Sequence, residues 1–114
     1  MLRAFYTEYF NLESGDKYVN PSKNFTSYFL SFGKDNARIE LMNVPDMVNK
    51  AGGGNLKGLA HFAIAVGSPE AVNALTERLR ADGYAVLSEP RITGDGYYES
   101  AVADPEGNYV KITV

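Results

Sequence analysis

The apolar residues of the first half of the chain recur first at helical and then at strand spacing. Those within residues 1–10 lie three to four positions apart, which predicts a short amphipathic helix. The turn-rich residues 11–16 end it. Three strands are then predicted: 17–20, 25–32 and 37–44. In the last of these strands, Ile39 and Leu41 share one face and Glu40 lies on the other.

The second half of the chain shows the same succession of helical spacing and then strand spacing, but a strand precedes its helix. Residues 59–66 alternate, so that His61 falls on the face opposite the large apolar side chains. Ser68, followed by Pro69, has the sequence of a helix start, and the helix is expected to end near Gly83. Three further strands are predicted: 84–88, 97–103 and 109–114.

A connector, residues 45–57, separates the halves and contains three consecutive glycines. The segment lacks the Lys-Ser/Thr of a phosphate-binding loop and the glycine spacing of a dinucleotide site. We therefore favour a flexible linker, with a moving lid or a phosphate loop as alternatives.

The two halves are related by a nearly constant interval. Val110 and Ile112 follow Ile39 and Leu41 by the same 71 residues, which indicates two copies of one unit. The strand that opens the second copy has no counterpart, because its equivalent would precede Met1.

Composition narrows the class of protein. The chain has 114 residues, 45% hydrophobic and 22% charged, as expected for one globular domain. Its net charge of −3, without a basic run, argues against nucleic-acid binding. The absence of cysteine excludes disulfides, thiol catalysis and a cysteine zinc site. No signal peptide or apolar run long enough for a membrane span is found, so we expect a cytoplasmic protein without a membrane partner.

Several stretches resemble small bacterial members of the vicinal oxygen chelate superfamily, which includes glyoxalases, extradiol dioxygenases and bleomycin-resistance proteins. These stretches are FYTEYFN, ARIELM, GLAHFAIAVGS, LRADGY and DPEGNYVKI. The resemblance covers residues 1–114 and implies an α+β fold, a single domain of tandem βαβββ modules forming a curved mixed sheet. The first module, 1–44, would lack its opening strand, and the second would occupy 58–114.

The resemblance also implies a divalent metal held by one histidine and one glutamate from each module. On this chain the second histidine corresponds to His61 and the first glutamate to Glu40. The second glutamate corresponds to Lys111, and the first histidine has no counterpart. Two of four ligands remain, so we expect weak binding of Zn, Ni, Co, Mn or Fe, or no metal at all.

A lysine at a ligand position changes the chemistry, because an ammonium group repels a dication. We hypothesise that Lys111 replaces the charge of the metal and pairs with Glu40 across the cavity, which makes both residues catalytic candidates. Taken alone, Lys111 also fits an exposed residue of an edge strand. In the same way, His61 fits a structural histidine and Glu40 a solvated glutamate.

Two further residues are candidates for the wall of a substrate cavity. Arg91 is expected on a loop where such proteins contact substrate, and Tyr98 on a strand. A solvated loop and ordinary core packing, respectively, are the alternatives.

Three functions stay open at this point. The first is a metal-dependent lyase or isomerase resembling glyoxalase. The second is a metal-free protein that sequesters a small molecule, and the third is a relative without chemistry. We favour a protein with an incomplete metal site that binds or acts on a small molecule in a cavity lined by both modules. The resemblance implies a homodimer, which would also cover the edge left by the missing strand.

Overall fold

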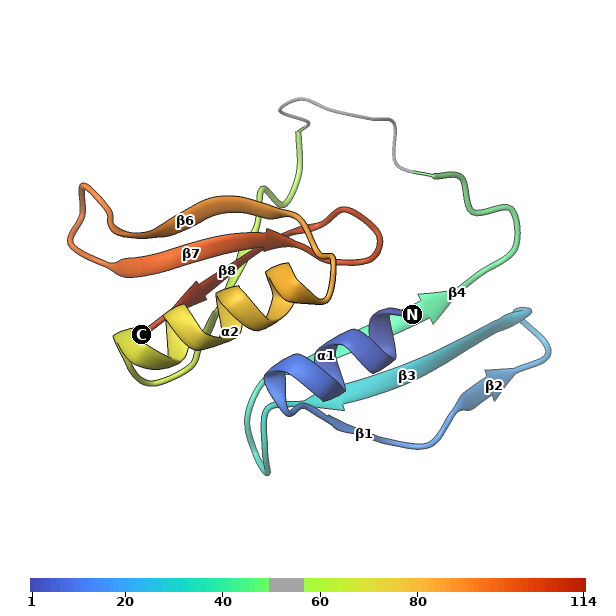
Figure 1. Cartoon of the computed structure of the whole chain (residues 1–114). Coiled ribbons are helices and arrows are strands. Elements are labelled where there is room, and N and C mark those ends of the chain that lie inside the picture. The colour runs from blue at the N-terminus through green and yellow to red at the C-terminus, as the bar shows by residue number, and fades with distance from the viewer. Residues whose placement is uncertain (50–56) are drawn as a thin grey trace. The chain divides into compact units, whose positions relative to one another are not determined.

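The computed structural model of the protein describes residues 1–49 and 57–114. The chain divides into two compact units, Met1–Gly54 and Asn55–Val114, shown in Figure 1. This division falls within the predicted connector. The three glycines of the connector lie outside the described residues, so the choice between linker, lid and phosphate loop stays a prediction.

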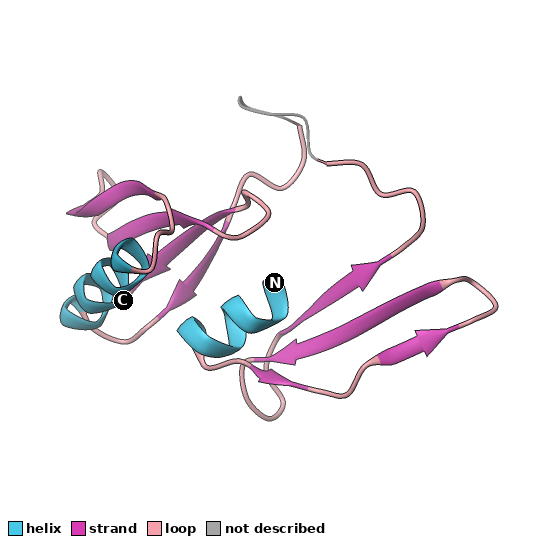
Figure 2. Cartoon of the chain, turned by 45° about the vertical axis from the view of Figure 1, so that its right-hand side comes forward, coloured by secondary structure: helices cyan, strands magenta, loops and turns pink. Residues whose placement is uncertain are grey.

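The described residues of the first unit contain one helix, α1 (Leu2–Phe10), as the helical spacing predicted. The helix ends at Asn11, whose backbone has the left-handed φ of 55° that commonly terminates helices. Phe5, Tyr6 and Tyr9 are its buried residues. Its strands, coloured magenta in Figure 2, are β1 (Glu13–Ser14), β2 (Tyr18–Asn20), β3 (Phe25–Ser31) and β4 (Arg38–Asn43).

β3 is the centre of the first sheet. β4 pairs with one side of it, while β1 and β2 pair antiparallel with the two ends of the other side. β1 lies within residues 11–16, for which the sequence predicted only a turn. That prediction was wrong at Glu13–Ser14, because two residues are too few to show a period. Among the described strands, β4 pairs with β3 alone.

In the second unit, residues 57–114 form one helix that packs on one face of a mixed sheet (Figure 1). The order of its strands is β5-β8-β7-β6, with β5 parallel to β8 and the other neighbours antiparallel. Its elements are β5 (Phe62–Ala65), α2 (Pro69–Ala81), β6 (Val86–Ile92), β7 (Tyr98–Ala103) and β8 (Tyr109–Thr113). No helix among the residues described in either unit is both long and apolar enough to span a membrane.

The start of α2 confirms the predicted cap. The Oγ of Ser68 accepts a hydrogen bond of 3.1 Å from the amide of Ala71, and Pro69 is the first helical residue. A cap of this kind stabilises a helix by about 1 kcal/mol.

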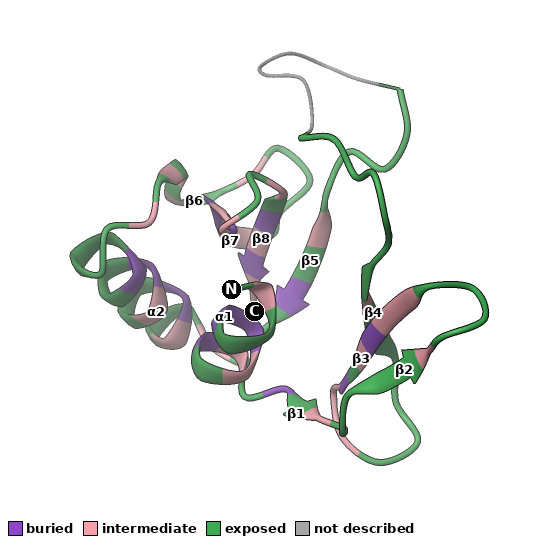
Figure 3. Cartoon of the chain, turned by 90° about the vertical axis from the view of Figure 1, so that its right-hand side faces the viewer, coloured by how far each residue is buried: buried purple, intermediate pink, exposed green. Residues whose placement is uncertain are grey.

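Alternation in β8 directs its apolar side chains to the core. Val110 and Ile112 are fully buried, as are Val72 and Leu79 of α2 and Val102 of β7. Burial of each of these aliphatic side chains contributes about 1.5–3 kcal/mol. In Figure 3 the buried segments of β7, β8 and α2 are purple.

Two strands, both in the second unit, differ from their predicted bounds by more than one residue at an end. β5 begins only at Phe62, because its pairing with β8 extends over four residues. His61 therefore precedes the strand rather than lying inside it. β6 continues to Ile92, past the predicted end at Ser88, and includes Pro90. It can do so because β6 is an edge strand, where a missing N–H costs little.

Candidate functional site

An ion pair lies on the face of the second sheet that α2 does not cover. The Nζ of Lys111 is 2.7 Å from Oε1 of Glu99, and the two side chains are 28% and 13% exposed. β8 lies between β5 and β7, so the interpretation of Lys111 as an edge-strand lysine is wrong. The structure pairs Lys111 with Glu99 of its own unit. The predicted pairing with Glu40, a residue of the other unit, stays a prediction.

The register of the strands explains this pairing. Lys111 lies directly opposite Ala101 on β7 and Ala63 on β5, two small residues that leave space around its side chain. Glu99 is two residues from Ala101 on the same strand and face, which is the diagonal position that long side chains reach. Glu99 was not among the site residues predicted from the sequence, although alternation along β7 places it on the same face as Ala101.

The ion pair reinforces the positive charge of the lysine. The hydrogen bond to Glu99 raises the pKa of Lys111 above its ordinary value, and the negative charges of Glu99 and Asp95 raise it further. Lys111 is therefore an ammonium group at neutral pH. In this form it donates hydrogen bonds, and it neither ligates a metal nor acts as a nucleophile.

The ion pair borders a small hollow of about 80 Å³. The side chains around it are mostly polar, and they come from three neighbouring strands and the β6–β7 turn. The lining residues are Ser88, Arg91, Thr93, Glu99, Ser100, Ala101, Tyr109 and Lys111. Arg91, predicted as a cavity residue, is thus brought together with Lys111.

Tyr98, the other predicted cavity residue, does not line this hollow. Its hydroxyl donates a hydrogen bond of 2.6 Å to Oδ1 of Asn73 on α2. Tyr98 thus contacts the helix on the opposite face of the sheet.

An irregularity in β6 brings Arg91 to the hollow. Ser88 pairs with Ala101 and Arg91 pairs with Glu99, so β6 has one residue more than β7 between the two pairs. Residues three apart in a regular strand point to opposite faces. The extra residue of this bulge, next to Pro90, places Ser88 and Arg91 on the same face.

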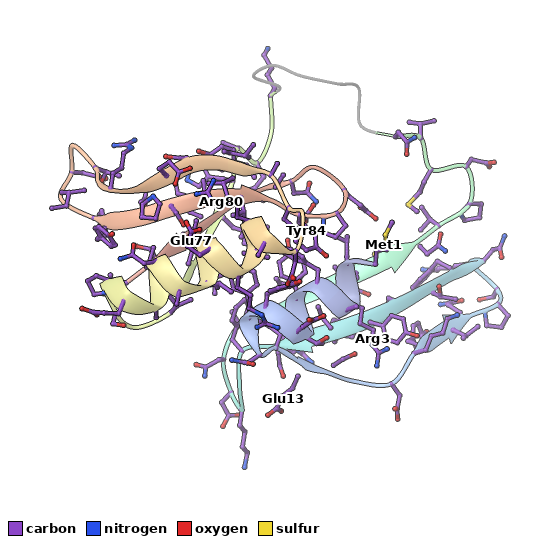
Figure 4. The ribbon with its side chains drawn as sticks, viewed as in Figure 1. Met1, Arg3, Glu13, Glu77, Arg80 and Tyr84 are labelled. Atoms are coloured by element: carbon purple, nitrogen blue, oxygen red, sulfur yellow. The ribbon has the colours of Figure 1, made fainter. Side chains whose placement is uncertain are left out.

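The residue within the bulge points elsewhere. Glu89 pairs with Arg80 of α2, with Oε2 2.6 Å from Nη2. Glu77, labelled beside Arg80 in Figure 4, also pairs with it at 3.2 Å. These two carboxylates raise the pKa of Arg80 through hydrogen bonds, and they tie β6 to the helix.

His61 lies beside the hollow without lining it. Its ring is 5.8 Å from the ring of Tyr109, which is a lining residue. The contact follows from register, because the residues after these two, Phe62 and Val110, are paired across β5 and β8.

Glu40 belongs to the first unit. It is an exposed residue of β4 and lies opposite Phe29 of β3. The guanidinium of Arg38 lies 5.0 Å from the ring of Phe29, on the same face.

The first unit also has a hollow of its own, about 530 Å³ in volume, which Glu40 does not line. It is lined by uncharged residues: Val19, Asn20, Pro21, Asn24, Phe25, Thr26, Asn43, Val44 and Pro45.

The donors of the second unit do not fit a resident divalent metal. Within the part of the chain that the structure describes, no three His, Cys, Asp or Glu residues gather as a metal site would require. Glu99, the carboxylate of the hollow, is engaged by an ammonium group and is therefore not free to ligate a dication.

Comparison with known proteins identifies the family. A family model described as the Glyoxalase/Bleomycin resistance protein/Dioxygenase superfamily matches residues 2–112. The chain belongs to this superfamily. The α+β fold predicted from the resemblance is thereby confirmed.

Solved structures of the superfamily resemble the chain over nearly its whole length. A glyoxalase I mutant from Zea mays is 29% identical with a TM-score of 0.78, covering 98% of this chain and 39% of that one. A glyoxalase family protein from Enterococcus faecalis is 22% identical, with a TM-score of 0.75 and coverage of 98% and 85%. A domain from Frankia reaches a TM-score of 0.81 at 16% identity, covering 99% and 85%.

The last two likenesses show the fold alone, and the chain spans only 39% of the maize protein. A search of curated proteins found no match.

Proposed function

We propose that this protein binds a small molecule through a site whose metal-binding set is incomplete, and that the ammonium of Lys111 supplies positive charge where metal-dependent relatives use a cation. The observation that carries the proposal is the ion pair between Lys111 and Glu99 beside a polar hollow. The proposal includes the expectation from the resemblance that both modules line the cavity that binds the small molecule, with Glu40 as a residue of its wall.

The chemistry that Lys111 offers is electrostatic. An ammonium has three N–H donors, and the contact with Glu99 uses one of them. The others are available to an oxygen of a ligand, and they would stabilise negative charge that develops on it. Lys111 is the catalytic candidate in this sense, as a donor and not as a base.

A second candidate function is a lyase or isomerase activity like that of glyoxalase. It is favoured by the 29% identity with the maize glyoxalase I mutant over nearly the whole of this chain. This activity would require His61 and Glu40 to act together, with or without a weakly bound metal.

Calorimetric titration with Zn²⁺ and Ni²⁺ tests the proposal. We expect weak binding by the unaltered protein and binding at least about tenfold tighter by Lys111→Glu, because a second carboxylate would stand beside Glu99 near His61. Lys34→Glu changes the same charge at an exposed turn of the first unit and should leave the affinity unchanged. Tight stoichiometric binding by the unaltered protein would overturn the proposal, as would equal affinities of the protein and Lys111→Glu.

We also propose that the protein forms a homodimer. β8 has a strand on both sides, whereas β4, which matches it in the repeat, pairs with β3 alone among the described strands. An unpaired edge favours association with another strand. Light scattering at micromolar concentration should give twice the 12.5 kDa of one chain, and a stable monomer would contradict the proposal.

A further inference from the structure

We infer that the hollow of the second unit is a binding site for the carboxylate group of a small molecule, held between Arg91 and Lys111. The inference rests on the proposed function, because it names the ligand class of the same metal-independent site. It assigns recognition of the carboxylate to Arg91 on β6 and Lys111 on β8. These two strands pair with opposite sides of β7, which carries Ala101.

Arg91 provides the first set of donors. It is exposed, and none of the described carboxylates lies within ion-pair distance of its guanidinium, so its N–H groups are available. A guanidinium presents two parallel N–H groups that match the two oxygens of a carboxylate. Lys111 provides the second set, because Glu99 fixes its position while using one of its three donors.

The backbone builds this arrangement. Without the bulge at Pro90, Ser88 and Arg91 would point to opposite faces of β6. With it, Ser88 and Arg91 lie on one face of β6 and both line the hollow, where Ala101, opposite Ser88 and Lys111, contributes only a small side chain.

The size of the hollow selects a functional group and not a whole ligand. Its volume of about 80 Å³ is far below the roughly 300–1,000 Å³ that enclose a drug-sized molecule. A carboxylate fits this space, while the rest of the ligand would extend outward from it.

The charges near the hollow define how it attracts an anion. Arg91 and Lys111 are balanced by Glu99 and Asp95, whose charges act on the two cations. The net charge is therefore zero, and binding depends on directed donors rather than on a general positive field. Removing the charge of Asp95 should then strengthen binding, whereas removing that of Arg91 should weaken it.

Titration of the ¹⁵N-labelled full chain with acetate, followed by NMR, tests this inference. Acetamide serves as the uncharged probe of the same shape. We expect millimolar binding of acetate, with shifts in β6, β7 and β8, and at least about tenfold weaker binding of acetamide. Arg91→Gln should lower the affinity for acetate about tenfold, and Arg91→Lys should lower it less because the charge remains.

Asp95→Asn keeps the side-chain oxygen that Thr93 contacts and should bind acetate several-fold more tightly. Lys23→Gln, which removes a cation from an exposed turn of the first unit, should bind as the unaltered protein does. Equal shifts with acetamide, no shifts with acetate, or unchanged affinity in Arg91→Gln with native spectra would each overturn the inference. The proposed function fails independently, through tight metal binding, whatever the acetate result.

Discussion

Thr76 of α2 and Ser100 of β7 form a buried hydrogen bond of 2.7 Å that joins the helix to the sheet of the second unit. The single hydroxyl proton of Thr76 goes to the carbonyl oxygen of Val72, at 2.6 Å. Ser100 is therefore the donor to Thr76, and both side chains are almost completely buried. This link depends on both partners, because a buried hydroxyl without a partner is costly.

Replacing one partner should accordingly cost more than replacing both. We expect Thr76→Val to lower the free energy of unfolding by about 1–3 kcal/mol, since it leaves the hydroxyl of Ser100 without its acceptor. The double variant with Ser100→Ala should recover part of this loss. Urea unfolding measures the free energies of unfolding of both variants. Equal losses in the single and double variants would show that the hydrogen bond between Thr76 and Ser100 does not couple the two side chains.

The core of the second unit should be sensitive at Ile112 and tolerant at Ile92. Ile112 is 0% exposed and Ile92 is 71% exposed, although both are isoleucines in strands. Ile112→Ala should lower the free energy of unfolding by about 2–5 kcal/mol. Ile92→Ala is the matched control and should change it by about 0.5 kcal/mol or less. Similar losses at the two positions would contradict the assignment of faces in this sheet.

The ion pair of Lys111 should stabilise the fold up to alkaline pH. Its pKa in the folded protein is raised above the ordinary value of 10.5 by Glu99. The stabilisation is therefore fully present below 10.5 and is lost as the pH rises through the folded value. We expect the difference in Tm between the protein and Lys111→Met to be constant from neutral pH to about 9.5 and to shrink above that range.

Thermal melts across this range provide the measurement. Lys23→Met, at an exposed turn, should show no corresponding pH dependence. If the difference in Tm between the protein and Lys111→Met grew with rising pH, the pKa of Lys111 would be lowered by folding and not raised.

The titration of Asp95 should depend on Thr93. The hydroxyl of Thr93 donates a short hydrogen bond to Oδ1 of Asp95, and this bond is the largest cause of a pKa below the ordinary 3.8. The stabilisation is therefore present above 3.8 and is lost as the pH falls through the lowered pKa. Thr93→Val should move this pKa back toward 3.8, whereas Thr93→Ser should leave it low.

An NMR titration of the carboxyl carbon of Asp95 provides the measurement. Equal midpoints in Thr93→Val and Thr93→Ser would exclude the hydroxyl as the cause.

Local sequence determined most of the secondary structure, because the signals act over a few residues. Helical spacing in residues 1–10 and the cap at Ser68 each correspond to an observed helix. Alternation correctly separated Val110 and Ile112, which are buried, from Lys111. The resemblance pointed to the superfamily that the family match shows.

Only the tertiary structure decided what the charged side chains contact. The partner of Lys111 depends on the register between β7 and β8, which pairs residues of separate strands and brings Glu99 into reach. The face of Arg91 depends on a bulge that adds one residue to β6, against the regular alternation that a sequence pattern assumes. The pattern of apolar and polar residues along one strand shows which residues share a face. Contacts between residues of different strands arise only when the backbone hydrogen bonds set the alignment of neighbouring strands.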